Sequence, residues 1–478
     1  MSFTSFNFIL YFPILITCYW VVPKKYQRSL LLISSYLFYF NIKPIFSLLL
    51  MYVTSCTYIF ALLMENTLEE SKKSKYLIVS IFLILLPLVF YKYFGPINDV
   101  MITTLDVFGA RWALPEIKLI LPVGISFYTF VSIGYIVDVY NGEISAEKNI
   151  GTVGLFISFF PLIMSGPIER SKTLLPQLQQ ESTFNYTLIK KGTRLLLWGY
   201  FMKLVVADRL GLYIDSVYGH IPEHNGTSLL LASFLYPFQV YADLGGYSLI
   251  AIGTSKMLGI DVIQNFKRPF FATSMAEFWR RWHISLISWL TDYVYTPLAY
   301  AFRRYRIWGI VLALLITFLI SGIWHGAALT FIVWGVLQGI FLSVEALTQK
   351  KRSNYERRYN LNGSRWYPIL GVCVTFLLFS SSQIFGRADS VNDALLVYTK
   401  IFSAPGKLFV GSPSVLIYGL FWLMILLSKD YLDEYMPNKF KIFDNDNKYV
   451  QLLAYNSLIF IILLFGVFDG GQFIYFQY

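Results

Sequence analysis

The sequence predicts an all-α polytopic membrane protein, and its composition, its hydropathy and the length of its apolar runs lead to that prediction. Of the 478 residues, 56% are hydrophobic and 14% are charged, whereas soluble globular proteins average about 25% charged residues. The mean hydropathy is +0.56. The apolar residues gather in runs of roughly 15–25 residues, the length that crosses a hydrocarbon core of about 30 Å. This composition disfavours a soluble enzyme and a disordered chain.

The apolar runs follow one another along the whole chain. Several are too short to span a bilayer alone, and we expect these to be tilted or re-entrant, which gives about 10–13 crossings. No internal repeat or low-complexity linker separates the runs, so we expect a single transmembrane domain over residues 1–478. The runs lie near residues 6–22, 29–41, 43–64, 76–96, 118–140, 151–166, 192–207, 227–240, 246–260, 307–324, 327–347, 366–385, 408–428 and 450–468.

The net charge of +11 indicates contact with membrane lipid rather than binding of nucleic acid. The basic residues gather in loops such as 303–306 and 350–365, and basic loops anchor membrane proteins on the cytoplasmic side and contact anionic lipid. We therefore expect membrane lipid as a partner and no nucleic acid.

One polar segment, residues 261–306, is not typical of a membrane span, because it mixes tryptophans and tyrosines with several charged residues. Ser274 and Glu277 have the spacing of a capping box, and Glu277 precedes Arg281 by four residues, the favourable order for a helical ion pair. The pattern predicts a short helix that begins near residue 275 with an aromatic, arginine-rich face. An interfacial helix that holds Trp and Arg at headgroup level is the alternative.

His325 is the strongest catalytic candidate from its position alone. It lies between the apolar runs 307–324 and 327–347, and ionisable groups at membrane depth are expensive and mark functional sites by default. Burial disfavours the charged imidazolium, so the ring is expected to be neutral and able to act as a general base. The flanking Gly322 and Gly326 leave room beside the ring. A histidine that only packs between helices is the alternative.

Other polar residues give weaker signals. His283 ends the aromatic stretch that starts at Phe278, and the two histidines His283 and His325 are candidates for one site. Asp243 lies among glycines, which indicates a broken or tightly packed backbone. His220 and His224 lie in a polar stretch with Pro and Gly, which predicts a surface loop, so we expect no metal site.

The chain resembles the membrane-bound O-acyltransferase family, and within it the branch of alginate O-acetyltransferases. Matching stretches occur in family order over essentially the whole chain, and the run from Glu277 to Ser285 followed by Trp324-His325-Gly326 is highly specific. Gln338 is a departure, since related sequences often have a further histidine there. The other matching stretches are residues 121–130, 160–170, 246–253, 265–269, 324–331, 334–335 and 473–476.

The resemblance implies a fold and roles for individual residues. The implied fold is a ring of tilted helices, with re-entrant and interfacial helices, around a central tunnel that joins a cytoplasmic funnel to the outer face. His325 matches the histidine regarded as catalytic, and His283 matches the second histidine of the bacterial branch. His283, Arg280 and Arg281 are expected to hold the anionic donor or to stabilise the developing oxyanion. The residues predicted to bind substrate are Arg280, Arg281, Trp324 and Asp243.

The expected function is O-acyl transfer in the bacterial cytoplasmic (inner) membrane. No cofactor is expected to be bound. An acyl thioester, acetyl-CoA in the first instance, is the expected donor, and an extracytoplasmic polysaccharide such as alginate or a cell-wall glycan receives the acetyl group, directly or through a partner acetyltransferase. D-Alanyl transfer to teichoic acid and a non-catalytic transporter of acetyl groups or glycans are the two alternatives.

Overall fold

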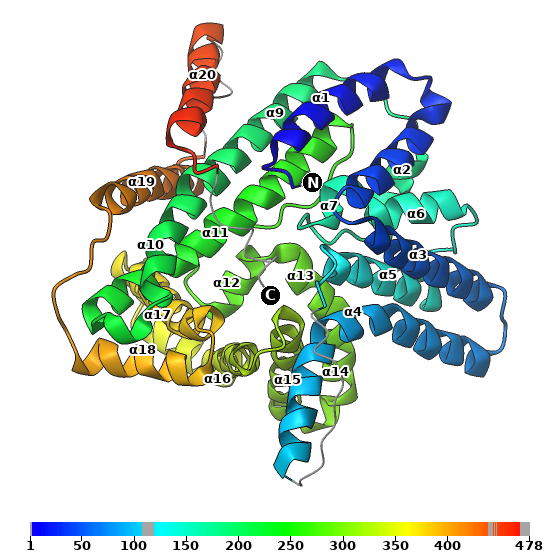
Figure 1. Cartoon of the computed structure of the whole chain (residues 1–478). Coiled ribbons are helices and arrows are strands. Elements are labelled where there is room, and N and C mark those ends of the chain that lie inside the picture. Colours follow the sequence, from blue (N-terminus) through cyan, green and yellow to red (C-terminus); the bar gives the residue numbers. More distant parts are fainter. Residues whose placement is uncertain (1, 108–118, 438–442, 444, 446, 469–478) are drawn as a thin grey trace. The chain divides into compact units, whose positions relative to one another are not determined.

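The computed structural model describes residues 2–107, 119–437, 443, 445 and 447–468, and the helices follow the chain from blue to red in Figure 1. The protein is about 80% helical, and the described residues contain no strand. The expectation of an all-α fold is therefore confirmed. The matching stretch at 473–476 lies outside the described residues.

Among the described residues, seven helices are long and apolar enough to cross a membrane, which supports a multi-pass membrane protein. Two shorter apolar helices, α1 (Phe6–Val21) and α5 (Ile125–Tyr140), also occur. The seven helices are α3 (Pro44–Glu65), α4 (Glu70–Val107), α15 (Ile307–His325), α16 (Leu329–Arg358), α17 (Trp366–Arg387), α19 (Pro413–Tyr435) and α20 (Lys448–Phe465).

The expected crossings, about 10–13 in number, exceed these seven helices, and several apolar runs share a helix or form short helices. The runs 227–240 and 246–260 fall mainly within one continuous helix, α11 (Gly226–Met257). The run 151–166 contains two short helices, α6 (Ile150–Ser158) and α7 (Phe160–Ile163). Apolarity marks these segments, but it does not show where one helix ends and the next begins.

The chain divides into two compact units, and the expected single domain remains a prediction. The first unit comprises residues 1–193 and 251–263. Its helix α3 packs against α4 and α5, and the buried Asp138 accepts a 2.5 Å hydrogen bond from the hydroxyl of Ser171. Its other helices are α2 (Lys24–Phe40), α8 (Ser171–Gln179) and the larger part of α9 (Tyr186–Tyr200).

The second unit comprises residues 194–250 and 264–478, and it holds every predicted site residue. Within it α15 and α16 form a tightly packed hairpin, and α12 packs against α16 and α17. The remaining helices of this unit include the π-helical turn η1 (Phe201–Ala207), α10 (Asp208–Tyr218), α12 (Met275–Arg281), α13 (Ile284–Leu290), α14 (Thr296–Ala301) and α18 (Val391–Ser403).

Candidate active site

The crossing of α15 and α16 places His325 at a helix end. A Cβ on Gly322 would lie 2.4 Å from the carbonyl oxygen of Phe331, and a Cβ on Gly335 would lie 2.4 Å from that of Phe318. Only glycine lets the two backbones approach so closely, as small residues do where membrane helices cross. The helix α15 ends immediately after this contact, at His325.

Aromatic rings surround the half-buried His325. Its ring centroid lies 5.0 Å from that of Trp334 and 4.7 Å from that of Trp324, both edge-on, and 6.5 Å from the nearly parallel ring of Phe331. Trp279 from α12 adds a further wall, 6.0 Å from Trp334 between ring centroids. These rings restrict the rotation of the imidazole and exclude water from most of its surface.

His283 is held in an unusual backbone conformation between two short helices. As predicted, α12 begins after Ser274, whose hydroxyl accepts a hydrogen bond from the N–H of Glu277. The Glu277 carboxylate accepts from the N–H of Thr273, one residue before the position expected in a capping box. His283 then caps α13 with φ of +46°, a region that residues other than glycine seldom occupy.

Burial gives His283 a neutral ring. The residue is 3% exposed and lies outside the seven apolar helices. Burial lowers the pKa of the His283 imidazole to about 3, because the charged form loses its hydration, although a hydrogen bond with its own backbone opposes the shift. The ring is therefore uncharged at neutral pH.

Trp324 links the two histidines. Its indole contacts the ring of the adjacent His325, and it lies 6.5 Å from the ring of His283 between centroids. The structure therefore brings the two predicted catalytic histidines and Trp324 into one aromatic cluster. The roles assigned to these residues remain predictions.

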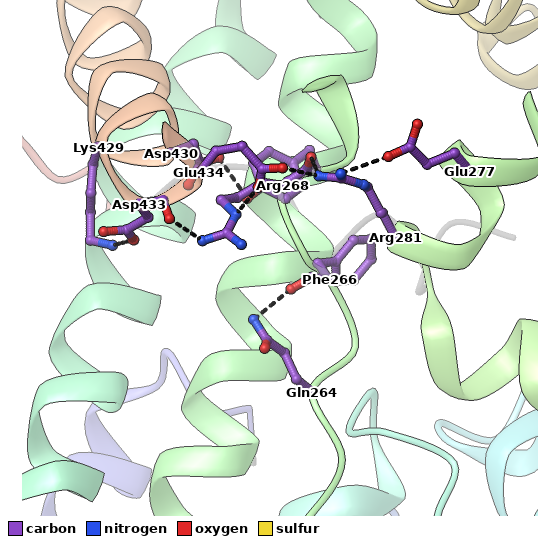
Figure 2. Close-up of polar contacts among 10 residues, drawn as sticks. Gln264, Phe266, Arg268, Glu277, Arg281, Lys429, Asp430, Asp433 and Glu434 are labelled. Atoms are coloured by element: carbon purple, nitrogen blue, oxygen red, sulfur yellow. Dashed lines mark hydrogen bonds and ion pairs between the residues drawn. The ribbon is translucent and has the colours of Figure 1, made fainter. Parts of the chain in front are cut away.

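The two neighbouring arginines have different surroundings. Arg280 is exposed, so its guanidinium is accessible to an anionic group. The guanidinium of Arg281 is already paired, at 2.7 Å with Glu277 and at 2.9 Å with Glu434 at the end of α19. Figure 2 shows these two carboxylates on opposite sides of Arg281. Its contacts indicate a structural role more than a role in donor binding.

Asp243 belongs to a buried charge cluster. The ammonium of Lys203 lies 2.5 Å from an Asp243 oxygen and 2.7 Å from an Asp208 oxygen, and none of the three side chains is more than 8% exposed. Helix α11 continues unbroken through Asp243, and the glycines beside it serve close packing: a Cβ on Gly246 would lie 2.7 Å from the carbonyl oxygen of Gly199. This resolves the two interpretations of the backbone in favour of tight packing.

The remaining polar candidates, His220, His224 and Gln338, have contacts of their own. His220 is exposed, and His224 is partly exposed beside the carbonyl of Ser216. Among the described residues, no group of three His, Cys, Asp or Glu side chains is arranged to hold a metal ion. Gln338 is fully buried in α16 and donates a 2.6 Å hydrogen bond to the hydroxyl of Ser382.

Comparisons with known proteins identify the family. The profile of the membrane-bound O-acyltransferase family matches residues 149–383, a range that contains all six predicted site residues. A probable alginate O-acetylase of Pseudomonas aeruginosa is 33% identical over 410 residues, which cover 84% of this chain and 75% of the relative. The chain belongs to the membrane-bound O-acyltransferase family. It is therefore an O-acyltransferase, and a multi-pass membrane protein.

Two further relatives have lower identity over a shorter part of this chain. A peptidoglycan O-acetyltransferase of Helicobacter pylori is 31% identical over 368 residues, 71% of this chain and 67% of the relative. A teichoic acid D-alanyltransferase of Bacillus subtilis is 28% identical over 271 residues, 55% of this chain and 67% of the relative. The similarity thus extends further along the chain for the two O-acetyl transferring relatives.

Sequence reasoning missed two parts of this candidate site. Trp279 was noted only within an aromatic stretch and Trp334 only within a stretch that matches the family, and the contact between them depends on how α12 packs against α16. The pairing of Arg281 with Glu434 joins residues 153 positions apart. The repeated spacing of Trp and Phe residues was a usable signal for the two tryptophans, whereas no local pattern pointed to the ion pair between Arg281 and Glu434.

Proposed function

We propose that this acyltransferase moves an acetyl group from acetyl-CoA, bound from the cytoplasmic side, toward an extracytoplasmic polysaccharide, with His325 as the general base. The single observation that carries the proposal is the half-buried imidazole of His325 at the end of a transmembrane helix, within an aromatic cluster that also contacts the buried His283. A neutral imidazole in such surroundings is suited to accept a proton.

The proposed reaction is a direct transfer. The imidazole of His325 takes the proton of an acceptor hydroxyl, whose oxygen forms a bond to the thioester carbonyl carbon. The C–S bond then breaks, and the departing thiolate takes the proton back from His325. The sequence offers no nucleophile motif that would favour a covalent acyl-enzyme.

We assign supporting roles in the reaction to several further groups. The buried indole N–H groups of Trp279 and Trp334 have no hydrogen-bond partner in the described part of the chain, and a buried donor of this kind has a hydrogen bond to offer. The oxygen of the thioester carbonyl, which becomes negative in the transition state, is the acceptor we assign to them. Arg280 is exposed and suits the phosphates of the donor.

The identity of the acceptor polysaccharide is proposed only from the names of the relatives. Relatives over most of the chain are named for alginate and for peptidoglycan, so an exopolysaccharide or a cell-wall glycan outside the bacterial inner membrane is the proposed acceptor, reached directly or through a partner acetyltransferase. The shorter and weaker similarity to the D-alanyltransferases makes D-alanyl transfer the second outcome to examine.

Purified protein in lipid vesicles tests the proposal. Wild-type protein should release free thiol from acetyl-CoA in the presence of an acceptor glycan, and His325→Ala should lower the rate by about 10²–10⁴-fold, the usual contribution of a general base. His220→Ala is the matched control, since that histidine is exposed in a loop of the same unit. A transporter without chemistry would cleave no thioester, and equal rates for both histidine variants would contradict the role of His325.

A further inference from the structure

The backbone on both sides of His283 is held by a second segment of chain. The N–H of Lys267 donates to the carbonyl of Arg281 at 2.8 Å, and the N–H of Ile284 donates to the carbonyl of Asn265 at 2.8 Å. The side chain of Asn265 also accepts from the N–H of Ser285. Residues 265–267 therefore hold the chain immediately before and after His283.

Two residues in the segments 265–268 and 281–285 have strained backbones. His283 and Arg268 both have φ of +46°. Residues other than glycine persist in this region only where their surroundings determine the conformation, and such strain gathers at functional sites. Something must therefore stabilise the two segments against relaxation.

One carboxylate joins the two segments. Oε2 of Glu434 lies 2.6 Å from Nε of Arg268, and Oε1 lies 2.9 Å from Nη1 of Arg281. The guanidinium of Arg268 also donates to the carbonyl of Asp433, and that of Arg281 also pairs with Glu277. Figure 2 shows both guanidinium groups converging on the end of α19.

The position of this bridge distinguishes it from an ordinary surface ion pair. The side chains of Glu434, Arg281 and Arg268 are 17%, 18% and 25% exposed, so the bridge is partly shielded from water. On the same helix end, Lys429 and Asp433 form an ion pair four residues apart with 36% and 45% exposure. The Asp433 carboxylate pairs with a neighbour on its own helix, whereas the Glu434 carboxylate joins two arginines from another part of the chain, so Asp433 provides a matched control.

We propose that Glu434 is a positioning residue for the acyltransferase reaction, because its bridge between Arg268 and Arg281 maintains the left-handed backbone that places the ring of His283 against Trp324. The inference rests on the proposed function, in which His283 borders the reacting groups. Loss of the bridge releases the backbone at residues 281–284 and shifts the ring of His283, while the donor site remains.

The first test compares turnover in vesicles for Glu434→Gln and for the control Asp433→Asn. The first variant should lower kcat by about 10- to 100-fold, the scale expected for misplaced groups in an active site, with the KM for acetyl-CoA within twofold of wild type, and the control should match wild type. A double-mutant cycle repeats the comparison in a His283→Asn background, which is chosen because asparagine tolerates the left-handed conformation. In that background Glu434→Gln should lower kcat by less than twofold further.

Hydrogen exchange supplies a readout that does not depend on activity. The amides of Lys267 and Ile284 should exchange at least tenfold faster in Glu434→Gln than in Asp433→Asn. If Glu434→Gln cannot be recovered folded, Arg268→Gln removes the same bridge from its other side, and the same outcomes are required of it.

Three results would overturn the proposal. Unchanged exchange at the two amides would show that Glu434 does not hold the segment. An equal loss of kcat with and without His283 would show that Glu434 acts elsewhere. Wild-type turnover of His283→Asn would leave no ring to position, and only if His325→Ala also retained turnover would the proposed function fail with it.

Discussion

Replacing Lys203 should destabilise the protein far more than replacing Asp243, although both changes remove the same ion pair. Lys203 lies 2.5 Å from Asp243 and 2.7 Å from Asp208, and the three side chains are almost fully buried. Their formal charges are one positive and two negative. Lys203→Met would leave two adjacent carboxylates without that ammonium. Asp243→Asn would leave the oppositely charged Lys203 and Asp208 beside an uncharged amide.

The magnitudes follow from this difference in charge. Removing one partner from a buried pair costs about 3–5 kcal/mol, and we expect Lys203→Met at or above the top of that range. Asp243→Asn exchanges a charged acceptor for a neutral one, and hydrogen bonds to charged groups contribute about 1.5–3 kcal/mol. The variant without any of the charges, Lys203→Met with Asp208→Asn and Asp243→Asn, should recover part of the loss, since the repulsion is gone.

Thermal unfolding in detergent, followed by fluorescence-detected size-exclusion chromatography, measures the ranking. The expected order of midpoints is wild type, Asp243→Asn, the uncharged triple variant and Lys203→Met, with the last lowest. A midpoint for Asp243→Asn at or below that of Lys203→Met would refute the charge argument. If Asp243 binds substrate instead, Asp243→Asn should keep the wild-type midpoint and raise KM.

Three further predictions concern the histidine site and its packing. Burial lowers the pKa of His283 to about 3, so the contribution of this residue to stability is complete above the ordinary histidine pKa near 6.5 and is lost as the pH falls from there toward 3. At pH 5.5 the loss is about 1.4 kcal/mol. The unfolding midpoint of His283→Asn should therefore depend less on pH than that of wild type. Gly246→Ala should cost about 1–3 kcal/mol because its Cβ would lie 2.7 Å from a carbonyl oxygen of α9, while Gly95→Ala, with open space around it, should not lower the midpoint. Gly326→Ala would place a Cβ 2.1 Å from the ring of Phe331 beside the catalytic candidate, so it should lower kcat at least tenfold, and normal turnover would contradict the assigned geometry.

Local patterns predicted the elements that carry the site. The capping residue Ser274 and the helical pair of Glu277 with Arg281 both occur as expected, because these contacts depend only on residues three or four positions apart. The helix α15 ends at His325 because the next residue, Gly326, has an extended backbone. The family resemblance then linked His283 and His325, and the structure places both against Trp324.

Contacts distant in sequence could not be predicted. The apolar runs on either side of Asp243 indicated two elements, yet they form one helix, because the intervening glycines pack against a neighbouring helix rather than breaking the backbone. The excess of positive charge near Arg281 suggested an anion site, but Glu434 from α19 neutralises this arginine. Only the tertiary packing decides whether a basic residue meets a substrate or a carboxylate.

The measurement that tests the central claim most directly is the amount of ester-linked acetate on the cell-envelope polysaccharides of a deletion strain. The strain is complemented with wild type, His325→Ala or His220→Ala at matched membrane expression. We predict that wild type and His220→Ala restore the O-acetate and that His325→Ala does not. Full restoration by His325→Ala would contradict the general-base assignment, and the presence of ester-linked D-alanine in place of acetate would contradict acetyl transfer.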